Sequence, residues 1–366
     1  MRAMILAAGY GTRLWPLTLD RAKPALPFMG RPLVGYVAEY LARFGCDEII
    51  VNLHHRPESV RAALGDGRDF GVRLSYIEEP VILGTSGAID NARAFLEGDT
   101  FIVVNGKLAT DIDLGAALET HRRERALATL VLRRNAGRER YSTVEVESGL
   151  VKRFGGYPAP PSDNAGSAIR ASVKNAVTGE SNEEASAGGA NSGSHNAESR
   201  NSESRGDAPL MFTGIQILDT RIFDYIPRGV FSHSVTDVYV PAIARGERIA
   251  AHVSDGMWHE LSTIQRYRDI SLALMRREGR DVEFGRGSVV EPGADVREAI
   301  LWEDVRVEAG ARVRRSILGA GVRVGRGELI EDAAVVRASL VREGERPEKA
   351  LAGEVRGDNF VVPLAQ

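Results

Sequence analysis

Residues 4–18 of the chain read Met4-Ile5-Leu6-Ala7-Ala8-Gly9-Tyr10-Gly11-Thr12-Arg13-Leu14-Trp15-Pro16-Leu17-Thr18, and Lys23-Pro24 follow. The apolar run over 4–8 predicts a short buried strand. Gly9 and Gly11 let the backbone approach a ligand closely, and successive backbone N–H groups in such a turn bind anions. Because Arg13 and Lys23 add fixed positive charge, the stretch predicts a cradle for a triphosphate.

The spacing of these residues excludes two common phosphate-binding motifs. The dinucleotide fingerprint requires a third glycine at the position of Leu14, and the Walker loop requires Gly-Lys-Ser/Thr after four spacer residues. The run Leu-Ala-Ala-Gly-x-Gly-Thr-Arg-Leu-x-Pro-Leu-Thr, followed by Lys-Pro, instead resembles the signature of the sugar-1-phosphate nucleotidyltransferases. That family includes mannose-1-phosphate guanylyltransferases and glucose-1-phosphate thymidylyl-, uridylyl- and adenylyltransferases.

The resemblance implies a reaction between a nucleoside triphosphate and a sugar-1-phosphate. It implies that Arg13 holds the triphosphate and that Lys23 contacts the α-phosphate region. Glu79 and the following Leu83-Gly84-Thr85 match a second family motif, expected as a loop before a helix over 88–96. Alone, that loop would also suit a helix N-terminus capped by Thr or Ser. The resemblance places the following residues at the nucleotide: Leu6, Ala8, Gly9, Gly11, Thr12, Arg13, Glu79, Gly84 and Thr85.

The resemblance also implies residues for the sugar and for a metal ion. Glu145, in an alternating strand over 141–146, and Gly214, in a strand over 210–218, are expected at the sugar. Ser142 stands where the family has Gly, and the Glu-Lys-Pro that the family often shows is missing. Glu260 stands where the family has a metal-binding Asp, and its carboxylate can also bind Mg²⁺ through oxygen. The same position suits an acidic residue near a helix N-terminus.

Lys107 is the strongest departure from the family pattern. It follows a buried strand over 101–104 and Asn105-Gly106, where the family has an Asp that holds the catalytic Mg²⁺. At about 4 Å and an effective dielectric near 20, each unit pair is worth roughly 4 kcal/mol, so a lysine would repel the dication by about twice that. Three outcomes stay open. Lys107 points away while Asp111 or Asp113 binds the metal, its ammonium replaces the metal charge, or the site binds without turnover.

Two functions therefore compete for the whole chain. The first is transfer of a nucleoside monophosphate to a sugar-1-phosphate, with GTP and mannose- or heptose-1-phosphate as the first substrates to consider. The second is a catalytically impaired regulatory or scaffolding subunit, which the lysine at position 107 favours. Retention of Arg13 and Lys23 favours the enzyme.

Hydrophobic spacing predicts an α/β core with a mixed, mostly parallel, Rossmann-like sheet. Helices are expected over 32–44, 58–64, 114–123, 222–226 and 264–275, with a further helix over 236–243 broken at Pro241. Strands are expected over 48–53, 74–77, 126–132 and 249–253, besides those already named. His54 and His55 are interpreted as polar residues at a strand end.

The C-terminal region repeats with a period of 17 residues. The repeat aligns Val290 with Val307 and Val324, Val296 with Val313 and Ile330, and Gly293 with Gly310 and Gly327. Apolar positions recurring every six residues predict a short left-handed parallel β-helix. Such a β-helix could also indicate an acyltransferase, which would use a histidine as its base, but no histidine follows His259, so acyl transfer is disfavoured. A role in a homo-oligomer or in binding a partner nucleotidyltransferase subunit is expected instead. Residues 360–362 are expected to pack on a neighbour.

Composition limits the other possibilities. The 366 residues are 43% hydrophobic and carry a net charge of −3, which gives no general attraction to nucleic acid or membrane. Cys46 is the only cysteine, which favours a cytoplasmic protein without disulfides. The N-terminal apolar run is too short for a signal peptide. The expected division is a nucleotidyltransferase domain (1–156 and 210–276), a disordered low-complexity insertion (157–209), a β-helix (282–340) and a tail (341–366).

Overall fold

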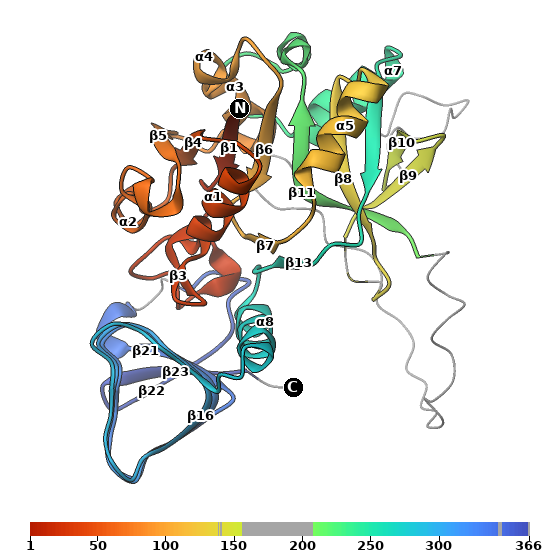
Figure 1. Ribbon diagram of the computed structural model, residues 1–366. Helices are drawn as coiled ribbons and strands as arrows, with labels where there is room; N and C mark the ends of the chain where they lie inside the picture. Colours follow the sequence, from red (N-terminus) through yellow and green to blue (C-terminus); the bar gives the residue numbers. More distant parts are fainter. Residues whose placement is uncertain (138, 140, 156–207, 343–345, 365–366) are drawn as a thin grey trace, which may run out of the picture.

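The computed structural model describes residues 1–137, 139, 141–155, 208–342 and 346–364. The predicted insertion at 157–209 therefore lies almost entirely outside the described residues. Figure 1 shows two parts, a sheet covered by helices and, beside it, a triangular coil formed by the C-terminal region. The four-part division of the chain given above stays a prediction.

A nine-stranded sheet forms the first part, in the order β5-β4-β1-β6-β11-β8-β12-β10-β9. β1, which leads into the N-terminal motif, runs parallel to its neighbours β4 and β6, and β4 runs parallel to β5. β11 is antiparallel to β6 and β8, whereas β12 is parallel to β8. The prediction of a mixed α/β sheet is thus confirmed. The strands are β1 (Arg2–Leu6), β4 (Glu48–Leu53), β5 (Arg73–Glu78), β6 (Phe101–Asn105), β8 (Ala128–Arg134), β9 (Thr143–Glu147), β10 (Leu150–Phe154), β11 (Leu210–Leu218) and β12 (Ile249–Val253).

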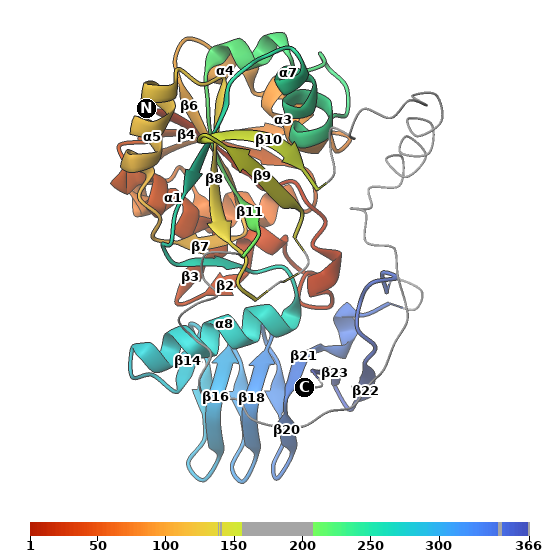
Figure 2. The ribbon, with the colours of Figure 1, turned by 90° about the vertical axis from the view of Figure 1, so that its right-hand side faces the viewer.

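Helices cover both faces of this sheet (Figure 2). One face packs against α1 (Leu33–Arg43), α2 (Pro57–Leu64) and α5 (Leu114–Glu124), and the other against α3 (Gly84–Asn91), α4 (Arg93–Leu96) and α7 (Val240–Ala244). β1 shows why, since side chains alternate along a strand. Ala3 and Ile5 enter the first core and Met4 enters the second, and all three are fully buried.

Three predicted segments differ from the structure. The stretch 83–88 was expected as a loop, but α3 already begins at Gly84, because the backbone N–H groups of Ser86 and Gly87 donate to the Ser232 carbonyl at 3.1 and 3.3 Å. The helix predicted over 236–243 is a π-helical turn (Ser234–Tyr239) followed by α7. Proline does not break it, because Pro241 lies in the first turn of α7, where no N–H is needed. The segment 222–226 is a 3₁₀ turn (Thr220–Asp224).

Two short strands connect the sheet to the C-terminal part. β7 (Leu108–Thr110) pairs antiparallel with β13 (Trp258–Glu260), and α8 (Ile264–Arg277) follows. Figure 2 shows α8 lying along the side of the triangular coil that faces the sheet. None of the helices in the described ranges, α8 included, is long and apolar enough to span a membrane.

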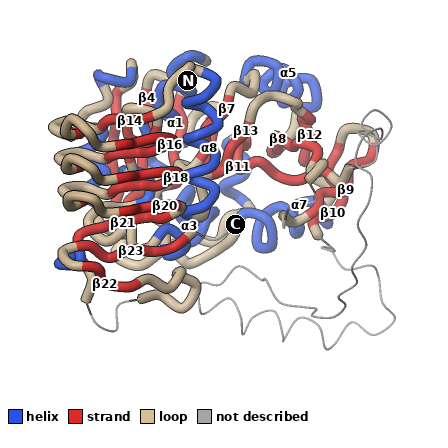
Figure 3. Tube along the Cα trace, turned by 90° about the horizontal axis from the view of Figure 1, so that it is seen from below, coloured by secondary structure: helices blue, strands red, loops and turns tan. Residues whose placement is uncertain are grey.

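The C-terminal part is a β-helix with the predicted 17-residue repeat, and Figure 3 shows its stacked coils. Val290 pairs with Val307, which pairs with Val324, and Val296 pairs with Val313, which pairs with Ile330. These valines and the isoleucine face a common core. The strands are β14 (Val282–Phe284), β15 (Val289–Val290), β16 (Asp295–Leu301), β17 (Arg306–Val307), β18 (Arg312–Leu318), β19 (Arg323–Val324), β20 (Leu329–Glu331) and β21 (Ala333–Arg337).

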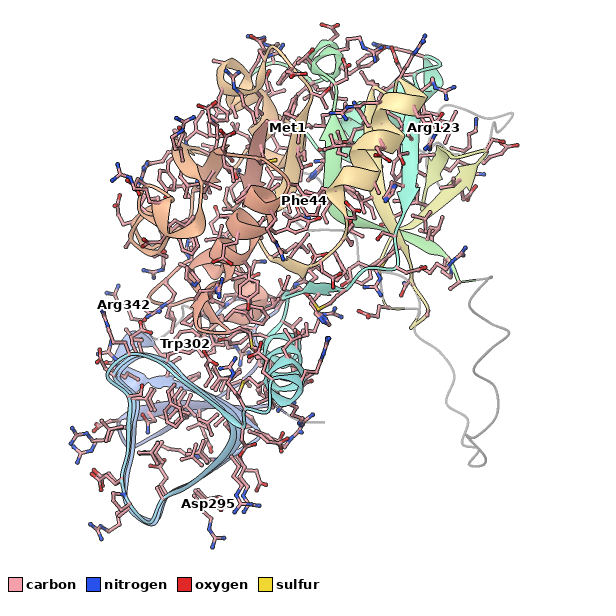
Figure 4. The ribbon with its side chains drawn as sticks, in the orientation of Figure 1. Met1, Phe44, Arg123, Asp295, Trp302 and Arg342 are labelled. Atoms are coloured by element: carbon pink, nitrogen blue, oxygen red, sulfur yellow. The ribbon has the colours of Figure 1, made fainter. Side chains whose placement is uncertain are left out.

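The last strands close one end of the β-helix. β23 (Asn359–Pro363) pairs antiparallel with β21 and with β22 (Glu354–Arg356), so the neighbour of residues 360–362 is the β-helix itself. The ring of Phe360 meets the ring of Trp15, edge to face, at 5.5 Å. Figure 4 shows Trp302 on the side of the β-helix that faces the sheet. Trp15, Trp302 and Phe360 belong to one core cluster that joins the two parts.

Candidate functional site

The topology of the sheet marks one edge as a ligand site. β1 lies between β4 and β6, so the chain leaves β1 first toward one side of the sheet and later toward the other. Leu6, the last residue of β1, is in register with Asn52 on β4 and Asn105 on β6. In open α/β sheets, ligands bind outside the carboxyl ends of the strands at such a switch point. The predicted cradle, which begins after Leu6, lies at this edge.

The glycine turn is shaped by close contact with the lysine that follows it. Gly11 adopts a left-handed φ of +69° and precedes a 3₁₀ turn (Thr12–Leu14). A Cβ at Gly11 would lie 3.0 Å from the Cβ of Lys23 and 3.1 Å from Cγ2 of Thr18. Side chains are therefore disfavoured at position 11 by both conformation and space. Of the other predicted cradle residues, Ala8 is buried, whereas Gly9 and Thr12 are exposed.

Two cations flank the turn. Arg13 is exposed and makes no ion pair with the described residues, so its guanidinium is available to a ligand. Lys23, which opens a second 3₁₀ turn (Lys23–Ala25), is partly buried. Burial, the nearby Lys107 and, to a smaller extent, Arg13 lower the pKa of Lys23 to about 7, although Glu260 acts in the opposite direction.

This shifted pKa predicts proton uptake when a triphosphate binds. Near pH 8, Lys23 is mostly neutral in the free protein. The negative charge of a bound triphosphate raises the pKa of Lys23 again, so binding should take up about half to one proton. Near pH 6 the lysine is already charged and the uptake should largely vanish. Calorimetric titration in two buffers of different ionisation enthalpy measures this quantity. Equal uptake by a Lys23→Met variant would contradict the assignment.

A buried pair of polar side chains ties the cradle to the second nucleotide motif. Asn52 accepts a hydrogen bond from the backbone N–H of Ala7 at 2.7 Å and donates to Glu79 at 2.6 Å. The other carboxylate oxygen of Glu79 accepts from the backbone N–H of Leu83 at 2.9 Å. Both Asn52 and Glu79 are 2% exposed. Through these hydrogen bonds, the predicted nucleotide residue Glu79 fixes the backbone at Leu83 directly and the backbone at Ala7 by way of Asn52.

His54 extends this network to the exposed side of the cradle. Its Nδ1 lies 2.6 Å from the backbone oxygen of Glu79, and its Nε2 lies 3.1 Å from the hydroxyl of Tyr10. Since a carbonyl can only accept, Nδ1 carries the proton, and the Tyr10 hydroxyl donates to Nε2. The earlier interpretation of His54 as a strand-end polar residue missed this link.

The predicted residues Gly84 and Thr85 contact a distant segment of the chain. The Thr85 hydroxyl accepts a hydrogen bond from the backbone N–H of Ser234 at 2.8 Å. A Cβ at Gly84 would lie 2.4 Å from the carbonyl oxygen of Ser232. These two residues therefore hold the 232–234 segment against α3.

The two predicted sugar residues lie on neighbouring strands. Gly214, with a φ of +80°, interrupts β11 where a Cβ would come within 2.1 Å of the side-chain nitrogen of Asn105. This close approach requires glycine and brings β11 against the end of β6. Glu145 is exposed on β9, which pairs with the start of β11, and its carboxylate lies 3.8 Å from Nε of Arg153. Gly214 thus lies at the candidate edge.

Lys107 and Glu260 form an ion pair beside the cradle. The pairing of β7 with β13 sets Glu260 opposite Leu108, and the backbone N–H of Leu261 donates to the Lys107 carbonyl at 3.0 Å. The Tyr141 hydroxyl donates to the second carboxylate oxygen of Glu260 at 2.9 Å. Burial raises the pKa of Glu260, but Lys107, Tyr141 and Lys23 together lower it below its usual value, so the carboxylate stays charged.

The residues at this place do not fit a magnesium ion held by the protein. Asp113 uses its carboxylate to cap α5, accepting from Gly115 and Ala116, and Asp111 accepts from the backbone N–H of Met257 at 2.6 Å. Across the described ranges, no group of three or more His, Cys, Asp or Glu side chains could hold a metal ion. The outcome in which Asp111 or Asp113 takes over as ligand is therefore not supported.

Comparison with known protein families agrees with this geometry. The model of the nucleotidyl transferase family matches residues 2–277, which contain the sheet and all the site residues described above. The chain belongs to this family. A second model, the GlmU-like C-terminal hexapeptide, matches residues 276–346. The resemblance drawn from the N-terminal motif is confirmed, and so is the expectation that the chain is an enzyme.

Two relatives match this nucleotidyl transferase over most of its length. The UTP–glucose-1-phosphate uridylyltransferase of Synechocystis is 28% identical over 84% of this chain and 72% of its own. The mannose-1-phosphate guanylyltransferase of Mycobacterium tuberculosis is 27% identical over 84% of this chain and 81% of its own. Among solved structures, a putative glucose-1-phosphate thymidylyltransferase of Bacillus anthracis in complex with sucrose has the same fold, with a TM-score of 0.55, 20% identity and coverage of 78% and 98%.

Sequence reasoning missed two residues of this nucleotidyl transferase site. Asn52 joins the cradle to Glu79, and its only signal was a polar amide within a buried strand. Tyr141 supports Glu260, and its ring packs edge to face on Trp258 at 5.6 Å. Nothing in the spacing of these residues along the chain brings Tyr141 near Glu260, because the contact depends on how β7 and β13 pair.

Proposed function

We propose that this protein transfers a nucleoside monophosphate from a nucleoside triphosphate to a sugar-1-phosphate, giving a nucleoside diphosphate sugar and pyrophosphate. The observation that supports it most is the cradle at the switch point, where Gly11 packs directly on Lys23 and the Arg13 guanidinium is free. The Synechocystis and Mycobacterium tuberculosis relatives of the protein are both named for reactions of this class.

The proposed reaction needs charge and positioning more than it needs a base. An oxygen of the sugar phosphate, already ionised, attacks the α-phosphorus, and the bond from that phosphorus to the bridging oxygen of the β-phosphate breaks. Pyrophosphate leaves with the electron pair of that bond, so no proton has to be removed. Arg13 would hold the triphosphate, Lys23 would contact the α-phosphate, and Glu145 would receive a hydroxyl of the sugar. Prearranged charges of this kind are a major source of catalytic rate.

A second candidate function is a regulatory or scaffolding subunit that binds nucleotide without turnover. The specific observation in its favour is the Lys107–Glu260 pair, which occupies the place where the family resemblance implies a metal ion. The β-helix would then contact an active partner subunit or a second copy of this chain. The cytoplasmic location expected from the single cysteine also stays a prediction.

The nucleotide and the sugar are part of the proposal. GTP with mannose-1-phosphate or a heptose-1-phosphate is our first choice, and the Mycobacterium tuberculosis relative, a mannose-1-phosphate guanylyltransferase, supports it. The Synechocystis relative, named for UTP and glucose-1-phosphate, supports a different pair. The comparison therefore leaves base and sugar to experiment.

Pyrophosphate release tests the function directly. ATP, GTP, CTP, UTP and dTTP are each combined with a panel of hexose- and heptose-1-phosphates, and the nucleotide sugar is identified by mass. We expect release that requires both substrates and is strongest for GTP. Arg13→Ala should lower it, whereas a change at the exposed Arg68 should not. Nucleotide binding without release for every pair would favour the regulatory subunit.

A further inference from the structure

The cradle carries an excess of positive charge before any ligand arrives. Of its three cations, Lys107 and Arg13 both lie close enough to Lys23 to lower the pKa of that lysine, in addition to the larger effect of burial. Glu260 is the carboxylate that opposes them, and it is paired with Lys107. Asp111 and Asp113 are occupied by backbone N–H groups elsewhere. The charges present thus favour a polyanion and disfavour a free dication.

Lys107 lies at the edge of the sheet where the cradle begins. Gly106, which precedes it, donates its backbone N–H to the Leu6 carbonyl at 2.9 Å, and a Cβ there would meet that same oxygen at 2.9 Å. The lysine therefore follows directly from the strand next to the start of the cradle. The Lys107 side chain is 26% exposed, whereas that of its partner Glu260 is 10% exposed, so the lysine is the more accessible member of the pair.

We propose that the Lys107 ammonium supplies, at the phosphates of the bound nucleotide, the positive charge for which the family resemblance implies a metal held by the protein. Glu260 and Tyr141 are positioning residues, because they contact Lys107 or one another and hold the ammonium at the edge of the cradle. The protein itself then binds no divalent ion at this place. The inference rests on the proposed function, since it concerns the same nucleotide site.

Nucleotide affinity with and without metal tests this assignment independently of turnover. GTP binding is measured by calorimetry in EDTA and in millimolar Mg²⁺, for the natural chain and for Lys107→Asp. We expect the natural chain to bind within about threefold under both conditions. Lys107→Asp should bind at least about tenfold more weakly in EDTA, the size of a lost charge-assisted hydrogen bond, and should recover with Mg²⁺.

Direct metal binding gives a second readout. The electron paramagnetic resonance signal of free Mn²⁺ should be unchanged by the natural chain without nucleotide, and it should fall when Lys107→Asp is added, because two carboxylates then meet at one place. Lys107→Arg keeps the cation and should retain binding in EDTA, whereas recovery of Lys107→Asp with Mg²⁺ shows that the Asp variant is folded.

Each outcome separates this inference from the proposed function. Binding by the natural chain that requires Mg²⁺, or a Mn²⁺ site in the natural chain, overturns the role of Lys107 even if pyrophosphate is released. Nucleotide binding that needs no metal and is lost in Lys107→Asp supports the proposed role of Lys107, even if no sugar phosphate in the panel reacts. Absence of binding under both conditions by all five nucleoside triphosphates (ATP, GTP, CTP, UTP and dTTP) overturns both proposals.

Discussion

Lys23→Met is expected to lower kcat by about 10²- to 10³-fold, the usual effect of removing one group that stabilises charge in a transition state. The same change should leave the protein as stable as before or slightly more stable below pH 7. There the charged lysine is partly buried and repelled by Lys107 and Arg13, as its lowered pKa shows. Methionine keeps most of the volume and removes this repulsion. Loss of activity together with unchanged or raised Tm is the expected signature.

Steady-state kinetics and thermal unfolding at pH 6.5 measure the two effects. The matched control is Arg68→Met, a change at a side chain that is 85% exposed in the 3₁₀ turn Arg68–Phe70, and it should alter neither quantity. A clear fall in Tm for Lys23→Met would show that the lysine contributes to folding. An unchanged kcat would remove Lys23 from the catalytic site.

Trp302→Ala should lower the free energy of unfolding by about 3–5 kcal/mol, the range measured for removing a large buried ring. Trp302 is 1% exposed and donates its indole N–H to the Tyr267 hydroxyl at 3.0 Å. The Arg21 guanidinium lies over its ring at 4.9 Å. Because Arg21 is two residues before Lys23, we also expect weaker nucleotide binding, although Trp302 lies in the β-helix.

Chemical denaturation of the whole chain measures the first effect, and nucleotide titration of the folded variant measures the second. Phe284→Ala is the matched control, because this ring lies in the same β-helix but is 57% exposed and should change stability little. Trp302→Phe keeps much of the packing and should cost about 1–2 kcal/mol for the lost hydrogen bond and volume. Similar losses for Trp302→Ala and Phe284→Ala would contradict the structural assignment.

Much of the fold could be predicted because it follows short-range patterns of apolar and small residues in the sequence. The short apolar run over 101–104, followed by Asn105-Gly106, is typical of a buried strand, and the 17-residue repeat of valines and glycines is typical of stacked coils. Segments stabilised by distant contacts were predicted less well. The sequence 83–88 is rich in glycine and small residues, and it becomes helical because the Ser232 carbonyl accepts from its first turn.

The candidate site also has a part that could be predicted from the sequence and a part that could not. The cradle could be predicted because Gly11, Arg13 and Lys23 lie within one short stretch. The partner of Lys107 could not, because Glu260 comes from a strand far along the chain and meets it only through the pairing of β7 with β13. Glu79 was expected at the nucleotide, and the spacing did not predict that its carboxylate oxygens accept from Asn52 and from the backbone N–H of Leu83.

The contact between Trp15 and Phe360 has a consequence for how the protein is made. During synthesis, which proceeds from the N-terminus, Trp15 emerges long before β23, the strand that covers it. Contacts between positions so far apart close slowly, because a long stretch of chain must be ordered before they form. The nucleotide site should therefore mature only after the β-helix and β23 have emerged and folded. Until then, Trp15 and its apolar neighbours remain available to chaperones.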